Sequence, residues 1–175
     1  MNITIRGSTT ADLPAITAIY DHAVRFGTAS FELDPPDATE MGRRREAILA
    51  SGYPHLVAEL DGAIVGYSYA GPYRPRPAYR FTVEDSVYVA PDMQGRGIGR
   101  ALLPALLQRC EANGYRIMIA VIGDTANTAS IALHTAFGFR RAGVLPAVGW
   151  KHGRWLDSVM MVRPLGPGAT TPPDR

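Results

Sequence analysis

The run SVYVAPDMQGRGIGRALLPALL, residues 86–107, constrains the fold more than any other part of the sequence. A β-rich segment stops at Pro91, glycines stand at Gly95, Gly97 and Gly99, and an apolar helical pattern follows at once. This order predicts a strand, a tight loop and the first turn of a helix. Such a turn binds phosphate through its free N–H groups and its positive dipole end, and glycine lets the backbone approach closely. We therefore predict an anion-binding loop; a helix start that binds nothing is the alternative.

The spacing of these glycines excludes two common nucleotide-binding motifs. The loop reads Gly95-x-Gly97-x-Gly99, which differs from the G-x-G-x-x-G of dinucleotide-binding folds. No Gly-Lys-Ser/Thr follows, although a P-loop requires it. The loop must therefore hold its phosphate in another way.

Strands and helices are predicted on both sides of this run, which indicates a mixed sheet with helices packed on it. Hydrophobic periodicity and turn residues give their order. It is a short N-terminal strand, helices over 13–24 and 37–52, a hairpin over 55–71 around Asp61-Gly62, a strand over 81–91, a helix over 98–114, a strand over 115–122, a helix over 126–139 and two strands over 139–164. Pro104 predicts a kink in the helix over 98–114, because proline lacks the N–H that would bond one turn back.

Composition indicates one globular domain and argues against two classes of partner. The chain has 175 residues, of which 46% are hydrophobic and 19% charged. We expect a single domain over 1–164 and a disordered tail over 165–175, which is rich in proline, glycine and threonine. A net charge of +2 does not favour nucleic acid or a membrane surface as the main partner.

Cysteine usage indicates a reducing compartment. Cys110 is the only cysteine, so no internal disulfide can form, and the first residues show no signal pattern. These features predict a soluble, cytoplasmic protein. Apolar neighbours make Cys110 a core thiol rather than a covalent acyl carrier.

Several segments together resemble one enzyme superfamily. Gln94-x-x-Gly97-x-Gly99 after a strand, followed by a helix, a strand and NTASIALHTAFGF, resembles the GNAT superfamily of acyl-coenzyme A-dependent N-acyltransferases. The segments over 53–89 and 143–161 resemble its phosphinothricin and methionine sulfoximine (or methionine sulfone) acetyltransferase branch. The likeness extends over roughly residues 3–164. It implies an α+β GNAT fold: a mostly antiparallel twisted sheet of six to seven strands, splayed between its central strands and flanked by four helices.

The resemblance also implies acetyl-CoA as co-substrate, no metal and a homodimer. The backbone of Val87 and Val89, beside Tyr88, would pair with the pantetheine arm as an added strand does. The residues that would hold the pyrophosphate are Gln94, Gly95, Arg96, Gly97, Ile98, Gly99 and Arg100. Asn127 and Ser130 would bind the pantetheine arm or the thioester region.

Acyl transfer to an amine needs a group that accepts the proton of the amine. Alternation along a strand puts Glu84, Ser86 and Tyr88 on one face, with Asp85 and Val87 on the other. The residues alone favour a solvated acidic pair, whereas the resemblance implies that Glu84 is the catalytic base.

His134 is the second candidate catalytic residue. It stands where many members of the superfamily have a tyrosine that donates a proton to the leaving sulfur. A histidine can donate that proton or relay one from the amine. The alternative is a histidine packed on the helix surface.

The loop over 72–80 concentrates positive charge and aromatic rings just before the Glu84 strand. It carries Arg74, Arg76 and Arg80, with Tyr73 just before them and Tyr79 between the last two. Guanidinium groups bind carboxylate, phosphinate or sulfone oxygens through paired hydrogen bonds. The predicted acceptor-binding residues are Phe31, Arg74, Arg76, Tyr79 and Glu84; a solvated loop, or a contact with the 3′-phosphate of the cofactor, is the alternative.

The segment GWKHGRWLD, residues 149–157, is a turn between two strands that is rich in aromatic and basic residues, and we interpret it as structural. Trp150 and Trp155 are predicted to anchor the core or, mainly, a homodimer interface. Lys151 or His152 is expected to contribute to the acceptor pocket.

The combined interpretation is an acetyl-CoA-dependent N-acetyltransferase that acetylates the α-amino group of small amino acids or their analogues by direct transfer. One alternative is acetylation of protein N-termini or polyamines, which requires an open acidic groove. The other is a sensor that binds acyl-CoA without catalysis.

Overall fold

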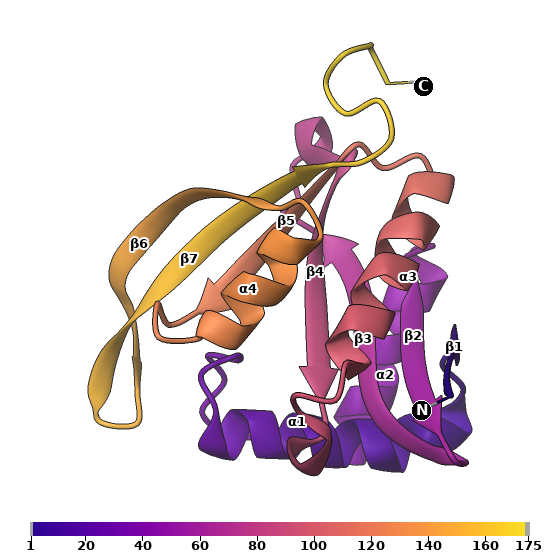
Figure 1. Ribbon diagram of the computed structural model, residues 1–175, viewed down its shortest axis with the longest axis vertical. Helices are drawn as coiled ribbons and strands as arrows, with labels where there is room; N and C mark the ends of the chain where they lie inside the picture. Colours follow the sequence, from indigo (N-terminus) through magenta and orange to yellow (C-terminus); the bar gives the residue numbers. More distant parts are fainter. Residues whose placement is uncertain (1, 174–175) are drawn as a thin grey trace.

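The computed structural model describes residues 2–173 and contains one seven-stranded sheet with helices on both faces (Figure 1). The strands are β1 (Ile3–Gly7), β2 (His55–Leu60), β3 (Ala63–Pro72), β4 (Thr82–Val89), β5 (Ile117–Gly123), β6 (Arg140–Lys151) and β7 (Arg154–Pro164). Their spatial order is β1-β2-β3-β4-β5-β7-β6, and every neighbouring pair is antiparallel except β4–β5. The predicted sheet is confirmed.

Four helices flank the sheet: α1 (Leu13–Phe26), α2 (Ala38–Ala50), α3 (Ile98–Ala112) and α4 (Thr128–Ala136). Helix α1 buries Ile16, Ile19 and Val24, at the helical spacing visible in the sequence. The side chain of Asp37 caps α2 by accepting a hydrogen bond from the Glu40 N–H at 2.8 Å.

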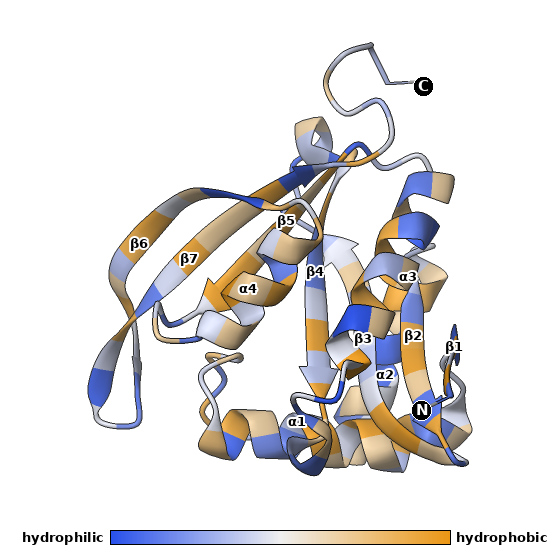
Figure 2. Cartoon of the chain, viewed as in Figure 1, coloured by the Kyte–Doolittle hydropathy of each residue, from blue (hydrophilic) through white to orange (hydrophobic). Residues whose placement is uncertain are grey.

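Each sheet face packs against its own helices because side chains alternate along a strand. In β2, Val57 packs with α1 and α2, whereas Leu56 and Ala58 belong to the clusters on the α3 side. Partly buried Ile131 and Leu133 of α4 join the Leu56 cluster. β5 lies inside the sheet and is hydrophobic along most of its length (Figure 2).

The two tight hairpins confirm the turns predicted from sequence. Asp61 and Gly62 adopt φ of 51° and 81° between β2 and β3. His152 and Gly153 adopt φ of 52° and 71° between β6 and β7. Two consecutive positive φ values give the turn twist that matches a right-twisted hairpin.

The central strands β4 and β5 separate halfway along their length. Their parallel pairing covers only Thr82–Asp85 against Ile117–Ala120. Beyond it, the described pairing of β4 is with β3 and that of β5 is with β7. The predicted splay is therefore confirmed, and one edge of β4 after Asp85 has no strand partner in the described part of the chain.

The segment after β7 differs from the sequence prediction of disorder. Leu165 is fully buried, and Arg116 donates hydrogen bonds to the carbonyl oxygens of Gly168 at 2.8 Å and Thr171 at 2.7 Å. Residues 165–172 thus lie against the start of β5. Residues 174–175, also part of that prediction, lie outside the described residues.

Helix α3 continues through Pro104, so the proline does not end the helix; the kink at this position stays a prediction. The carbonyl of Arg100 loses the N–H donor that would normally lie one turn ahead. Among residues 2–173, no helix combines the length and apolar character needed to cross a bilayer.

Candidate active site

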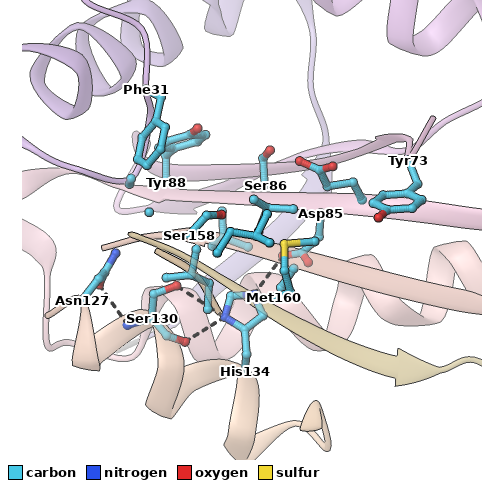
Figure 3. A pocket seen from close by; sticks show the side chains of 18 of the residues that line it. Phe31, Tyr73, Asp85, Ser86, Tyr88, Asn127, Ser130, His134, Ser158 and Met160 are labelled. Carbon is cyan, nitrogen blue, oxygen red and sulfur yellow. Dashed lines mark hydrogen bonds and ion pairs between the residues drawn. The ribbon is translucent and has the colours of Figure 1, made fainter. Parts of the chain in front are cut away.

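Two cavities meet where β4 and β5 separate. The smaller has a volume of about 520 Å³ and the larger about 730 Å³. The residues that line both are Ala29, Val87, Tyr88, Asn127 and Ser130. Figure 3 shows Asn127 and Ser130 at the start of α4, across the smaller cavity from Tyr88. The two cavities therefore form one continuous candidate site at the splay.

The glycine loop lines the larger cavity. Its lining includes Gln94, Gly95, Gly97, Ile98, Gly99 and Arg100, whereas Arg96 is not part of it. Gly97 is the N-cap of α3 with φ of 84°, and no side chain caps this helix end. The first N–H groups of α3 therefore remain available for an anion.

Gly99 is needed for packing as well. A Cβ at this position would lie 3.0 Å from Leu133 Cδ2 on α4, which is closer than normal van der Waals contact. Glycine thus lets α3 and α4 approach each other beside the cavity.

A valine at position 97 tests the phosphate role of the loop. The left-handed φ of 84° costs an L-residue roughly 1–2 kcal/mol. We expect Gly97→Val to raise the KM for acetyl-CoA about tenfold, because a site held by backbone N–H groups loses its geometry. The KM for the acceptor should change little. Gly7→Ala is the control, because a Cβ there meets no atom within 4 Å; a larger effect on the acceptor KM would make the loop an ordinary helix start.

The unpaired edge of β4 lies where the two cavities meet. Val87 and Val89 pair with Ser68 and Gly66 of β3 on one side, and no strand pairs with them on the other. Such an edge presents N–H and C=O groups to an extended amide-bearing ligand. Val87 lines both cavities and Val89 lines the larger one.

The smaller cavity combines two carboxyl groups, those of Glu84 and Asp85, with one guanidinium and apolar walls. Glu84, Arg74, Phe31 and Tyr73 line it. Its other walls include Val121, Leu145, Val148 and Met160. Arg76 and Tyr79 do not line it; the short 3₁₀ turn Pro77–Tyr79 places the Tyr79 ring edge-on against Tyr73, with 5.5 Å between the centroids.

Glu84 is half-buried in the wall of this cavity. Burial raises its pKa to about 7, and the adjacent negative charge of Asp85 adds to the effect. A carboxyl with this pKa can accept and release a proton near neutral pH. This environment differs from the solvated acidic pair that was the alternative interpretation.

Asp85 and His134 form a buried pair at the point where the strands separate. His134 Nε2 lies 2.9 Å from Asp85 Oδ2, and His134 Nδ1 lies 2.7 Å from the Ser130 carbonyl oxygen. The two side chains are 5% and 2% exposed, so His134 is not a surface histidine. Figure 3 shows the ring of His134 pointing from α4 toward Asp85.

The pair controls the protonation of His134. Burial acts to lower the pKa of the imidazole, but the hydrogen bond and negative charge of Asp85 outweigh it, so the pKa is raised. Because a carbonyl oxygen can only accept, Nδ1 carries a proton. Sequence reasoning put Asp85 opposite Glu84 but did not predict this partner, which lies 49 positions away.

Three further residues occupy positions that clarify the sequence predictions. Cys110 is fully buried, and burial raises the pKa of its thiol to about 12, which supports a core role. Lys151 donates to the Ser30 carbonyl oxygen at 2.6 Å, and His152 Nε2 lies 3.1 Å from that of Gly27. Neither Lys151 nor His152 lines the smaller cavity, contrary to the sequence prediction.

Comparison with known proteins identifies the family. The model of the acetyltransferase (GNAT) family matches residues 16–139. The chain belongs to the GNAT acetyltransferase family. The predicted superfamily, fold and acetyltransferase activity are thereby confirmed.

Similar proteins cover nearly the whole chain. A phosphinothricin N-acetyltransferase of Alcaligenes faecalis is 59% identical over 98% of this chain and 87% of its own length. An L-methionine sulfoximine/L-methionine sulfone acetyltransferase of Pseudomonas paraeruginosa is 43% identical over 98% of this chain and 100% of its own. The predicted branch of this GNAT family is therefore also confirmed.

Two solved acetyltransferase structures have the same fold as this chain. A phosphinothricin acetyltransferase from Sinorhizobium meliloti, in complex with acetyl-CoA, has a TM-score of 0.97 at 50% identity, covering 100% of this chain and 95% of that one. The protein yncA from Salmonella typhimurium, with its cofactor acetyl-CoA, has a TM-score of 0.94 at 41% identity and covers 98% of both chains. Both structures contain the co-substrate predicted from this sequence.

Proposed function

We propose that this GNAT acetyltransferase transfers the acetyl group of acetyl-CoA directly to the α-amino group of a small amino acid or analogue, such as phosphinothricin, methionine sulfoximine or methionine sulfone. The observation that carries the proposal is the meeting of two cavities at the splay, with Glu84 in the wall of the smaller one. The larger cavity fits acetyl-CoA, because a helix N-terminus and an open strand edge suit its pyrophosphate and its pantetheine amides. The smaller cavity then receives the acceptor.

In the proposed reaction the acceptor enters as an ammonium and Glu84 takes one of its protons. The free amine attacks the thioester carbonyl and a C–N bond forms. Glu84, having passed its first proton to solvent, accepts the second proton of the nitrogen, and the C–S bond breaks. Backbone N–H groups on the open edge near Val87 and Val89 polarise the carbonyl oxygen. The departing thiolate takes a proton and leaves as the free thiol of coenzyme A.

His134 is proposed to supply that proton through Ser130. Both ring nitrogens of His134 have partners, so a proton leaves the ring only by exchange with a neighbour. Ser130 Oγ lies 3.4 Å from His134 Nδ1, and Ser130 lines both cavities. Asp85 is a positioning residue in this scheme, because it acts through His134.

Arg74 is the proposed partner of the acceptor carboxylate. Its guanidinium lies 5.2 Å from the centroid of the Tyr73 ring, and both side chains line the smaller cavity. A guanidinium stacked on a ring still presents its donors to a carboxylate. The roles of Arg76, Tyr79 and Arg96 stay predictions, because these residues lie outside the two cavity linings.

An acceptor panel tests this function against its alternatives. Release of free thiol from acetyl-CoA is measured with phosphinothricin, methionine sulfone, spermidine and a short peptide as acceptors. We expect the highest kcat/KM for one of the two amino acids. Preference for the peptide or spermidine would favour the alternative enzymes, whereas tight acetyl-CoA binding without thiol release would favour the sensor.

We also propose that the protein forms a homodimer through the β6–β7 hairpin. Trp150 and Trp155 are 56% and 62% exposed and pack edge-on against each other, with 5.2 Å between their centroids. Leu145 and Val148 of the same hairpin are also exposed, and both line the smaller cavity. Large exposed apolar patches commonly mark protein interfaces.

Sedimentation analysis checks the dimer. We expect the wild-type protein to sediment at twice the chain mass of 18.9 kDa, and Trp155→Glu at the chain mass, because the charge would be desolvated in the interface. A monomeric wild-type protein, or a dimeric Trp155→Glu variant, would contradict this interface.

Location of the protein in the cytoplasm stays a prediction.

A further inference from the structure

Phe31 lies on the loop between α1 and α2 and forms part of the wall of the smaller cavity. It does not line the larger cavity, so its position affects the space for the acceptor alone. Phe31 is 39% exposed, and an aromatic ring on a loop keeps a fixed place only if neighbouring elements hold it.

Two glycines from distant parts of the chain leave room for this ring. A Cβ at Gly149 of β6 would lie 2.5 Å from Phe31 Cε2 and 2.7 Å from Cδ2. A Cβ at Gly123 of β5 would lie 2.7 Å from Phe31 Cε1 and 2.0 Å from the Thr28 carbonyl oxygen. Neither glycine has a positive φ, so the backbone does not require glycine at these positions. The missing side chains are what create the space.

Side-chain hydrogen bonds fix the residues just before the ring. Lys151, the single lysine of the sequence, is 4% exposed and donates from Nζ to the Ser30 carbonyl oxygen at 2.6 Å. The Tyr20 hydroxyl lies 2.9 Å from Ser30 Oγ. The Gly123 carbonyl oxygen accepts a hydrogen bond from Thr28 Oγ1 at 3.4 Å.

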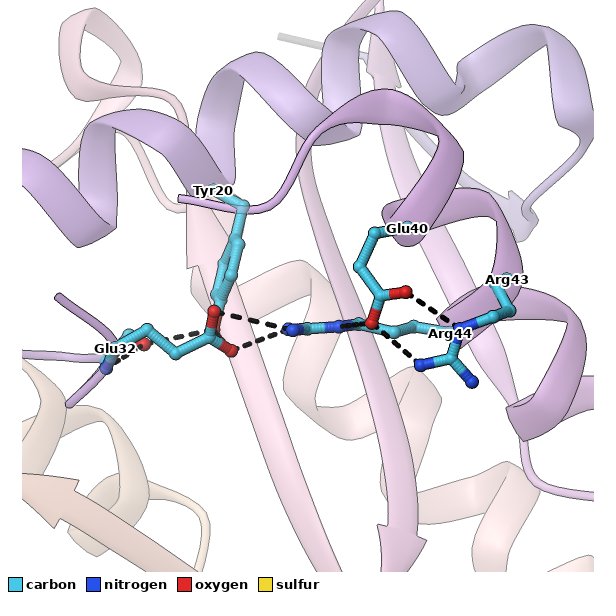
Figure 4. Close-up of polar contacts among 6 residues, drawn as sticks. Tyr20, Glu32, Glu40, Arg43 and Arg44 are labelled. Carbon is cyan, nitrogen blue, oxygen red and sulfur yellow. Dashed lines mark hydrogen bonds and ion pairs between the residues drawn. The ribbon is translucent and has the colours of Figure 1, made fainter. Parts of the chain in front are cut away.

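Ion pairs fix the residue after the ring. Glu32 accepts hydrogen bonds from Arg44 of α2 at 2.5 Å and from the Tyr20 hydroxyl at 3.0 Å, as Figure 4 shows. Glu40 in turn binds Arg44 at 2.7 Å. The loop is therefore held on both sides of Phe31.

We propose that Gly123 and Gly149 form a slot that seats the Phe31 ring, and that Lys151 locks the loop over it, so that Gly149 determines which acceptors fit the smaller cavity. The inference rests on the proposed function, since it assigns the acceptor to this cavity. A side chain at position 149 would displace the ring, while the larger cavity would keep its shape. The β6–β7 hairpin would thus shape the acceptor cavity in two ways, directly through Leu145, Val148 and Met160 and indirectly through the position of Phe31.

Gly149→Ala tests the slot kinetically. A displacement of about 1 Å in a positioning group can cost up to about a hundredfold in rate, so we expect the acceptor KM to rise about tenfold. The KM for acetyl-CoA should stay within about twofold, since Phe31 is absent from that cavity lining. Gly143→Ala is the matched control: Gly143 lies on the same strand, has no positive φ, and a Cβ there meets no atom within 4 Å.

A double-mutant cycle with Phe31→Ala separates the slot from a general effect on β6. In the Phe31→Ala background, Gly149→Ala should no longer raise the acceptor KM, because no ring occupies the slot. The same cycle on the thermal midpoint should show that Gly149→Ala lowers Tm only when Phe31 is present. Lys151→Met should raise the acceptor KM in the same direction as Gly149→Ala.

The Tm cycle requires no enzymatic activity, so it tests the slot even if the wild-type protein acetylates no amino acid in the panel. Absence of acetylation would overturn the proposed function and leave the test of the slot intact. Additive changes in Tm for Phe31→Ala and Gly149→Ala would overturn the slot. A slot confirmed by Tm with an acceptor KM unchanged in Gly149→Ala would overturn its role in specificity.

Discussion

Replacing Glu84 by glutamine is expected to lower kcat by roughly 10² to 10³-fold, which lies within the roughly 10² to 10⁴-fold contribution of a general base. Glutamine keeps the size and hydrogen-bonding capacity of the side chain but cannot accept a proton. The KM for acetyl-CoA should be almost unchanged, because Glu84 lines only the smaller cavity. Steady-state thiol release with methionine sulfone as acceptor measures both quantities.

The pH dependence of kcat/KM provides a second test of Glu84 as the base. Burial raises the pKa of Glu84 to about 7, and the base is active only when deprotonated. The kcat/KM of the wild-type protein should therefore rise with pH through about 7, and this limb should be absent in Glu84→Gln. Glu46→Gln, an exposed carboxylate of α2, is the control. Near-wild-type turnover of Glu84→Gln at several pH values would exclude Glu84 as the base.

Asp85→Asn is expected to lower turnover at pH 8 by up to about a hundredfold, because a general acid contributes roughly 10² or more. Asparagine can still donate a hydrogen bond to His134 Nε2 but supplies no negative charge. Burial, which lowers the pKa of His134, is then opposed only by the hydrogen bond to the Ser130 carbonyl, so the pKa falls and a smaller share of the ring is protonated at pH 8. The alkaline limb of the pH profile should move to lower pH in the variant.

Stability provides a second readout for the same variant. The pKa of His134 is raised in the folded protein, so the pair stabilises the fold fully below the unfolded pKa of about 6.5 and less as pH rises through the folded pKa. The difference in unfolding free energy between wild type and Asp85→Asn should therefore shrink toward alkaline pH. An unchanged alkaline limb with lowered stability would make the Asp85–His134 pair purely structural.

The local elements could be predicted from the sequence because their signals are local. The strand before residues 95–99, the glycine spacing there and the helical pattern after it predicted the strand–loop–helix element that lines the larger cavity, and Asp61-Gly62 predicted the β2–β3 turn. Strand alternation also placed Glu84 and Asp85 on opposite faces. These inferences require only neighbouring residues.

The contacts that complete the site could not be predicted because they join distant positions. The Asp85–His134 pair and the seat of Phe31 between Gly123 and Gly149 depend on how strands and helices meet in space. Lys151 was expected in the acceptor pocket, but its amine points to the Ser30 carbonyl oxygen instead. No periodicity in the sequence encodes such partners.

The identity of the product tests the proposed acetyl transfer most directly. Purified protein is mixed with acetyl-CoA and methionine sulfone or phosphinothricin, and the products are identified by mass spectrometry alongside the released thiol. We expect one N-acetylated amino acid for each free coenzyme A, with the acetyl group on the α-nitrogen. Free coenzyme A without an N-acetylated amino acid, or no turnover with either acceptor, would contradict the proposed function.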